Sequence, residues 1–159
     1  MIKVTRRAYL EHTTPEAIFA ALSDPKRIVT ILPRMQKVEM LNRDDANRKA
    51  RLVTHMGLGG IFGTIRCEGD LTWTEPREIV FKVRTPVPVE TRWTLTPAVN
   101  GTEIQAAMAL DLAPIMGPMA AFVPTQQVGE MLAAELDSAL KAIAAQLRDA
   151  GARERAAAA

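Results

Sequence analysis

The chain has 159 residues, of which 48% are hydrophobic and 24% are charged, a composition typical of one globular domain with a sizeable core. The formal net charge of +2 is too small to indicate a nucleic-acid partner or an anionic membrane surface. A single cysteine, Cys67, excludes an internal disulfide and a multi-cysteine metal site. No apolar run approaches the ~18 residues that a membrane-spanning helix needs, and no leader pattern precedes the first strand. We therefore expect a cytoplasmic protein.

The N-terminal third predicts one strand and two short helices. Apolar and polar residues alternate over 2–11, the period of a half-buried strand, with Arg6 interrupting the apolar side. Thr13-Thr14-Pro15-Glu16 then predicts a helix with a threonine cap and a proline in its first turn. Asp24-Pro25 predicts a second helix start directly afterwards, and Pro33 ends it.

Residues 35–112 predict six further strands joined by short turns. Each stretch alternates between an apolar and a charged side, and Asn100-Gly101 is a strong hairpin signal. Such a pattern indicates an antiparallel meander with one apolar and one charged face. Carboxylates such as Glu68, Asp70 and Glu90 fall on the charged face.

The C-terminal part predicts one long helix. Residues 112–123 contain two prolines and a glycine and are expected to be irregular. Beyond them, leucines recur at helical spacing up to Leu147, and Gly151 is the expected end. We therefore predict a single domain over 1–151 followed by a disordered tail over 152–159.

These elements together predict an α+β fold with a cavity. A seven-stranded sheet with one apolar face must cover that face, and only the long helix is large enough to do so. A strongly curved sheet gripping one helix leaves space between them. Pro124 and Gly129 weaken the start of the helix and would let it kink away, widening a mouth. The side chains expected to line the cavity and bind a ligand are Leu52, Met56, Ile65, Phe81, Val83, Trp93, Met108, Met119, Phe122, Val128 and Met131.

The order of elements and three short motifs resemble a known superfamily. The segment His12-Thr13-Thr14-Pro15-Glu16-Ala17-Ile18-Phe19, the junction Leu22-Ser23-Asp24-Pro25 and the pair Leu32-Pro33 are similar to START/Bet v 1-like (SRPBCC) proteins. Within that superfamily the chain is most similar to bacterial polyketide cyclase/lipid-transport-like proteins and distantly to the CO dehydrogenase G-subunit-like group. The resemblance implies a helix-grip fold and a cavity for lipids, polyketides or other hydrophobic molecules. It implies no shared catalytic residue.

The remaining motifs do not predict a metal or cofactor site. Gly57-Leu58-Gly59-Gly60 resembles the glycine-rich loop of Bet v 1-like proteins, but a phosphate loop needs a helix after it and here a strand follows. His12 and His55 lack the spacing of metal ligands. Cys67 lies among apolar positions and is interpreted as an inert core residue.

Three functions remain open. The leading hypothesis is a non-catalytic binder or carrier of a small hydrophobic molecule, because the alternation leaves no acid or base facing inward. A cyclase or dehydratase acting on a polyketide-like substrate is the second, and a bulge at Gly63 or Gly69 would favour it by turning Arg66 or Glu68 inward. An assembly module without a ligand is the third. The alanine-rich outer turns of the last helix fit a homodimer contact as well as they fit helix propensity.

Overall fold

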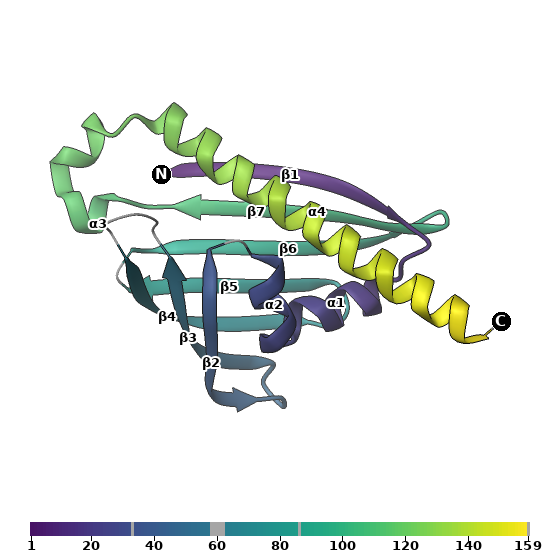
Figure 1. The fold of residues 1–159 in the computed structure, drawn as a ribbon. Coiled ribbons are helices and arrows are strands. Elements are labelled where there is room, and N and C mark those ends of the chain that lie inside the picture. The colour runs from purple at the N-terminus through teal and green to yellow at the C-terminus, as the bar shows by residue number, and fades with distance from the viewer. Residues whose placement is uncertain (33, 58–62, 86, 159) are drawn as a thin grey trace.

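The computed structural model describes the chain except for residues 33, 58–62, 86 and 159, and except for the side chains of 115 and 149–158. It has one antiparallel sheet in the order β1-β7-β6-β5-β4-β3-β2 (Figure 1). The strands are β1 (Ile2–Glu11), β2 (Met35–Asp44), β3 (Lys49–Gly57), β4 (Thr64–Thr74), β5 (Glu78–Thr85), β6 (Val89–Ala98) and β7 (Gly101–Leu110). The helices are α1 (Pro15–Ser23), α2 (Pro25–Ile31), α3 (Ala113–Met116), the 3₁₀ helix η2 (Gly117–Phe122) and α4 (Thr125–Ala158). The predicted α+β helix-grip fold is confirmed.

The two short helices begin where the sequence predicts. The hydroxyl of Thr14 accepts a hydrogen bond from the backbone N–H of Ala17 at 3.2 Å, and a proline follows the cap in the first helical position. The carboxylate of Asp24 likewise accepts from the N–H of Lys26 at 2.9 Å, and again a proline follows. Each cap satisfies an N–H group that the helix itself cannot pair.

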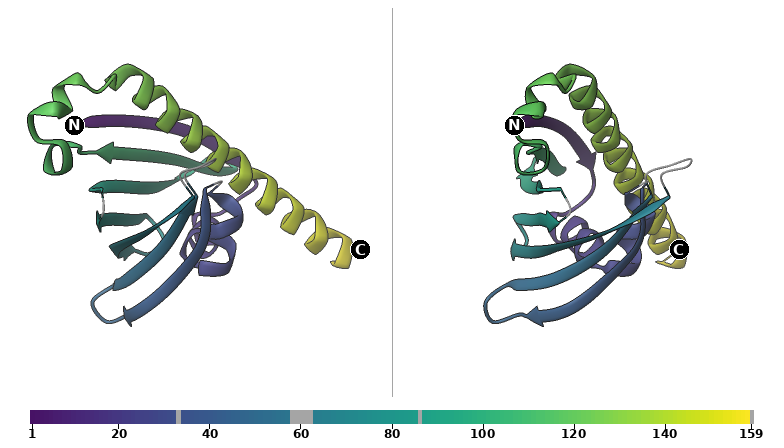
Figure 2. Two further views of the ribbon diagram at one scale, coloured as in Figure 1. Left: turned by 60° about the vertical axis from the view of Figure 1, so that its left-hand side comes forward. Right: turned by 90° about the vertical axis from the view of Figure 1, so that its left-hand side faces the viewer.

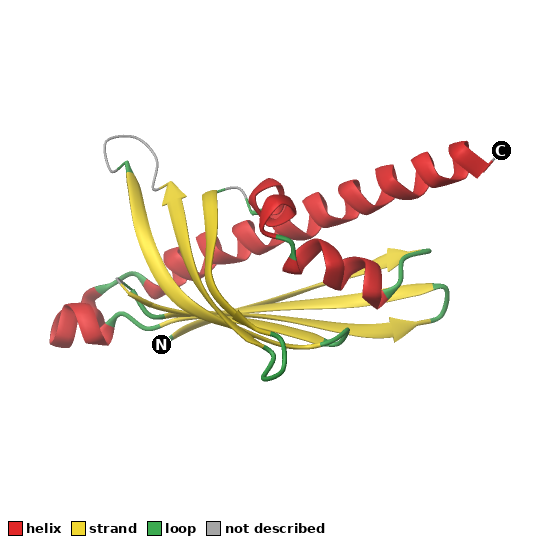
Figure 3. Ribbon diagram, turned by 90° about the horizontal axis from the view of Figure 1, so that it is seen from below, coloured by secondary structure: helices red, strands yellow, loops and turns green. Residues whose placement is uncertain are grey.

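The strongly curved sheet carries its helices on one side. α4 runs across β1 and β7, whereas β2 and β3 swing away from it at the opposite end of the sheet (Figures 1 and 2). α1 and α2 lie on the same side of the sheet as α4 and contact it (Figure 3). The sheet and the helices therefore enclose a wedge-shaped interior, which holds both a buried core and a cavity. No helix in the described part of the chain is long and apolar enough to cross a membrane.

One part of this wedge-shaped interior is a packed core. Five of its side chains are at most 2% exposed: Ile18 of α1, Leu95 of β6, Ile104 of β7, and Leu136 and Ile143 of α4. Side chains from both layers thus interdigitate at the middle of α4 and fix how the helix lies on the sheet.

The convex face of the sheet carries paired charges, as predicted. Arg92 forms ion pairs with Glu78 at 2.9 Å and Glu90 at 3.0 Å. Arg6, which interrupts the apolar side of β1, instead faces α4 and pairs with Asp137 at 3.4 Å. That pair explains how an arginine is tolerated at an inward position: its charge meets a carboxylate at the helix surface.

A bulge is present at Gly69, one of the two positions considered for it, but it does not reverse β4. The register between β4 and β5 shifts at Glu68 and Gly69, and the extra residue, Arg84, lies on β5. β4 therefore keeps its alternation. Glu68 stays outside, where it pairs with Arg66 at 3.0 Å, so the prediction that a bulge would turn either residue inward is wrong. Gly63 lies before β4 with a φ of +65°.

The predicted end of the last helix is wrong. α4 begins at Thr125, includes Gly129, and runs past Gly151, the predicted end, to Ala158. Residues 152–158 are alanine, arginine and glutamate, which are strong helix formers, and this propensity outweighs the single glycine. Within 112–123, expected to be irregular, residues 113–122 form α3 and η2.

Candidate functional site

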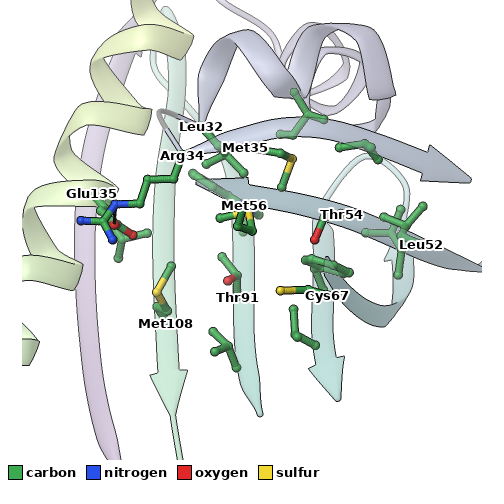
Figure 4. Close-up of a pocket in the computed structure, with 18 of the residues that line it drawn as sticks. Leu32, Arg34, Met35, Leu52, Thr54, Met56, Cys67, Thr91, Met108 and Glu135 are labelled. Carbon is green, nitrogen blue, oxygen red and sulfur yellow. Dashed lines mark ion pairs between the residues drawn. The ribbon is translucent and has the colours of Figure 1, made fainter. Parts of the chain in front are cut away.

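The wedge-shaped interior also holds a cavity of about 370 Å³ (Figure 4). Its floor is the concave face of β3 to β7, and its other walls come from α2, the start of β2 and the first turns of α4. The lining residues are Leu22, Ser23, Pro25, Ile28, Leu32, Arg34, Met35, Val38, Met40, Leu52, Thr54, Met56, Gly57, Ile65, Cys67, Leu71, Ile79, Phe81, Val83, Val87, Val89, Thr91, Trp93, Met108, Leu110, Leu112, Met131, Leu132, Glu135 and Leu136. This volume and this mostly apolar lining are typical of a site for a small hydrophobic molecule.

Eight of the eleven residues predicted from the sequence line this cavity. They are Leu52, Met56, Ile65, Phe81, Val83, Trp93, Met108 and Met131. Seven of them lie on strands, where period-2 alternation fixes which side chains face the helix. Their role in binding a ligand stays a prediction.

Met119, Phe122 and Val128 do not line the cavity, which corrects the prediction for them. Met119 and Phe122 belong to η2 and are 59% and 79% exposed. The reason is the path of the chain: after β7 it runs outward beyond the end of the sheet before α4 returns (Figure 1). Val128 belongs to the first turn of α4, which lies beside β1 rather than over the cavity floor of β3 to β7.

One whole wall of the cavity is formed by residues that were not predicted from the sequence. Ile28 and Leu32 come from α2 and its C-terminal end, and Met35 comes from the first residue of β2. The spacing of Ile28 and Leu32, four residues apart on a short helix, was a usable signal for a shared face.

An ion pair is built into this missed wall. The guanidinium Nε of Arg34 lies 2.6 Å from Oε1 of Glu135 on α4 (Figure 4). The side chains of Arg34 and Glu135 are 40% and 24% exposed. Of the described lining residues, these two are the only charged ones. A bond from the N–H of Gly57 to the carbonyl of Arg34, 2.8 Å long, fixes the backbone of the arginine against β3.

Burial controls the protonation of Glu135. Loss of hydration raises the pKa of its carboxyl group, and the charge of Arg34 opposes that increase without cancelling it. The cavity thus contains a carboxylate that holds its proton more tightly than an exposed glutamate does.

The other polar groups of the cavity are uncharged. Thr91 stands on the floor, and Thr54 and Cys67 are cross-strand partners on β3 and β4 (Figure 4). Burial raises the pKa of the Cys67 thiol, and the neighbouring Thr54 hydroxyl partly offsets this. The Thr54 side chain is only 1% exposed, and its hydroxyl has no hydrogen-bond partner of normal geometry among the described residues. A thiol with a raised pKa remains protonated and is a poor nucleophile, in agreement with the interpretation of Cys67 as inert.

Neither histidine belongs to the cavity. His12 is exposed beside Glu11, and His55 lies on β3 with its side chain outside the lining set. Within the described residues, no cluster of three histidine, cysteine or acidic side chains has a geometry that would hold a metal ion. Gly57 ends β3, but the rest of the predicted glycine-rich turn, residues 58–60, lies outside the described part of the chain.

Comparison with protein families gives a match over nearly the whole chain. The family described as polyketide cyclase / dehydrase and lipid transport matches residues 1–148. The chain belongs to this family. Its description combines cyclase and dehydrase activity with lipid transport. Membership therefore supports a role with a hydrophobic ligand, but does not show whether the ligand is only bound or is converted. No functionally curated protein matches the sequence.

Several solved structures share the fold. TTHA0849 from Thermus thermophilus has 17% sequence identity and a TM-score of 0.73, covering 93% of this chain and 98% of that one. A START superfamily protein from Mycobacterium smegmatis has 20% identity and a TM-score of 0.68, covering 92% and 99%. The Zhui aromatase/cyclase from Streptomyces sp. R1128 has 15% identity and a TM-score of 0.66, covering 91% and 92%. At these identities the likeness establishes the fold only.

Proposed function

We propose that this protein binds a small hydrophobic molecule, lipid-like or polyketide-like, in the cavity between the concave sheet and α4. The observation that carries the proposal is the cavity itself: about 370 Å³ of space, lined mostly by apolar side chains, beside a fully buried core. A chain that needed only stability would fill such a space, because an unfilled apolar void forfeits packing energy. The family match and the aromatase/cyclase among the structural neighbours support the same ligand class.

A second candidate function is a cyclase or dehydratase acting on the same ligand class. Glu135 favours it, because a general acid needs a carboxyl group that faces the substrate and holds its proton more tightly than an exposed carboxyl group does. The pKa of Glu135 is raised by burial, and its side chain reaches the cavity. We place this second because the carboxylate is already engaged by Arg34 and no other acid or base among the described residues lines the cavity. The cytoplasmic location and the homodimer stay predictions.

The experiment that tests the proposal compares two tryptophan variants on β6. Thr91→Trp places a large ring on the cavity floor, whereas Thr96→Trp places the same ring at an exposed position of the same strand. Binding of Nile red, an uncharged fluorescent hydrophobe, is titrated against both variants and the unaltered protein. Thermal unfolding verifies that each variant is folded.

We expect Thr91→Trp to weaken Nile red binding at least tenfold and Thr96→Trp to leave it unchanged. Equal binding by all three proteins would place the dye on an exposed surface and overturn the proposal. Native mass spectrometry of the protein purified from its host, followed by denaturing extraction, then identifies any ligand already held. Incubation of that ligand with the protein separates binding from conversion: a new product lost in Glu135→Gln would establish the second candidate.

A further inference from the structure

The ion pair in the cavity wall defines where the polar end of a ligand must lie. Nearly every other lining side chain is apolar, so a molecule that fills the cavity buries its hydrocarbon part against the sheet and α2. A polar group on that molecule loses its hydration on entry and needs a partner inside. Arg34 and Glu135 are the most strongly polar groups that it can meet.

The pair has no net charge to offer. One guanidinium and one carboxylate, 2.6 Å apart, neutralise each other. The uncharged residues Ser23, Thr54 and Thr91 supply the remaining side-chain oxygen atoms of the lining, and no second cation among the described residues faces the space. A carboxylate or phosphate entering the cavity would therefore approach Glu135 as closely as it approaches Arg34.

The pair can nevertheless bind uncharged oxygen. A guanidinium carries five N–H donors, more than one carboxylate accepts, so donors remain for a ligand carbonyl or hydroxyl oxygen. The carboxylate of Glu135 can in turn accept from a ligand hydroxyl. Both interactions are charge-assisted hydrogen bonds, which are stronger than those between neutral groups.

We infer that Glu135 is a specificity-determining residue: by neutralising Arg34 it makes the cavity select uncharged hydrophobic molecules bearing a hydroxyl or carbonyl group and discriminate against carboxylates. This inference rests on the proposed function, since it concerns the same cavity. It narrows the ligand class from hydrophobic molecules in general to neutral, oxygen-bearing ones. Free fatty acids and other anionic amphiphiles are excluded as the preferred ligands.

The test uses decan-1-ol and decanoate, two chains of equal length with a neutral and an anionic end. Each displaces bound Nile red at about pH 8, where the free acid is ionised. Preference for the alcohol in the unaltered protein is not decisive alone, because any apolar cavity penalises a charge. The variants decide: Glu135→Gln leaves a net positive wall, Arg34→Gln leaves a net negative one, and Glu130→Gln alters an exposed glutamate of α4 outside the cavity.

We expect Glu135→Gln to improve decanoate binding roughly tenfold, the size of one nearby charge at moderate screening, and to change decan-1-ol binding less than threefold. Arg34→Gln should weaken decanoate further, and Glu130→Gln should change neither ligand. An unchanged alcohol-to-acid ratio in both cavity variants would overturn the inference, as would failure of both ligands to displace the dye. In either case, Nile red binding that still depends on position 91 leaves the proposed function standing. The two variants shift the ratio in opposite directions, so a loss of folding in one leaves the other as the test.

Discussion

The floor of the cavity has no room for a side chain at Gly69, and the substitution Gly69→Ala tests this. Gly69 lies at the β4–β5 bulge, between Cys67 and Leu71, which both line the cavity. A Cβ atom at this position would lie 2.4 Å from the carbonyl oxygen of Lys82 and 2.9 Å from Cε2 of Phe81. The first contact is with backbone, so no side-chain rotation relieves it, and Gly69→Ala must push β5 away from β4.

The expected loss follows from two opposing effects. Overpacking of this kind costs about 1–3 kcal/mol, and the smaller conformational freedom of alanine in the unfolded chain returns about 0.4–1 kcal/mol. We expect Gly69→Ala to lower the free energy of unfolding by about 1–2 kcal/mol. In a domain of this size, that corresponds to a fall in Tm of about 2–8 °C.

Gly129→Ala is the matched control, because it makes the same chemical change where the added methyl group meets no clash. Its Cβ would lie 3.8 Å from Cγ1 of Val4 and 3.9 Å from Cγ2 of Ile2, which are ordinary contacts. Gly129 is inside α4, where alanine is favoured over glycine by about 1 kcal/mol. We therefore expect this variant to be stabilised. Denaturant unfolding of both variants measures the difference, and a Gly69→Ala protein as stable as Gly129→Ala would refute the register given for β4 and β5.

Two further predictions concern buried polar groups. Thr54→Val should raise the free energy of unfolding by roughly 1 kcal/mol, because it removes a buried hydroxyl that has no partner. Thr102→Val should lower the free energy of unfolding by about 1 kcal/mol, because the Thr102 hydroxyl donates to the carbonyl of Thr13 at 2.6 Å. Chemical denaturation compares them, and a destabilised Thr54→Val would mean that its hydroxyl is satisfied. The pKa of Glu135 is raised in the folded state, so the folded state binds this proton more tightly than the unfolded state does. The free energy of unfolding therefore falls as the pH rises from below 4.5, the ordinary pKa of a glutamate, through the pKa of Glu135 in the folded state. The stability of Glu135→Gln relative to the unaltered protein should therefore increase from acid to neutral pH, and a constant difference would contradict the pKa direction.

The strands of the fold and the floor of the cavity could be predicted because a strand has a simple period. Once one inward residue is known, such as Trp93 on β6, its neighbours two positions away share its face. The bulge at Gly69 does not disturb this reading, because its extra residue lies on β5 beyond Val83, the last residue of that strand on the cavity floor.

The walls made by helices and turns could not be predicted in the same way. The path of η2 depends on the tertiary course of the chain after β7, so Met119 and Phe122 look like lining residues in the sequence and are exposed in the structure. Glu135 lies next to Leu136, a residue of the apolar stripe of α4, and nothing in the helical period singles it out. Only the three-dimensional path brings Arg34, from the turn before β2, to Glu135. Pairing between such distant residues leaves no periodic signal.

The Arg34–Glu135 pair also allows a stability test of whether it serves the fold. A partly buried ion pair loses hydration energy that its attraction seldom exceeds, so replacing both partners by apolar residues is commonly neutral or stabilising. We expect Arg34→Met combined with Glu135→Leu to stay within about 1 kcal/mol of the unaltered protein or to exceed it, whereas Arg34→Met alone leaves a carboxylate unpaired and is less stable than the double variant. Denaturant unfolding of the single and double variants measures this. A double variant destabilised by about 3 kcal/mol or more would show that the fold needs the pair. A stable double variant with altered selectivity between decan-1-ol and decanoate would leave ligand choice as the reason that charge is kept in an otherwise apolar wall.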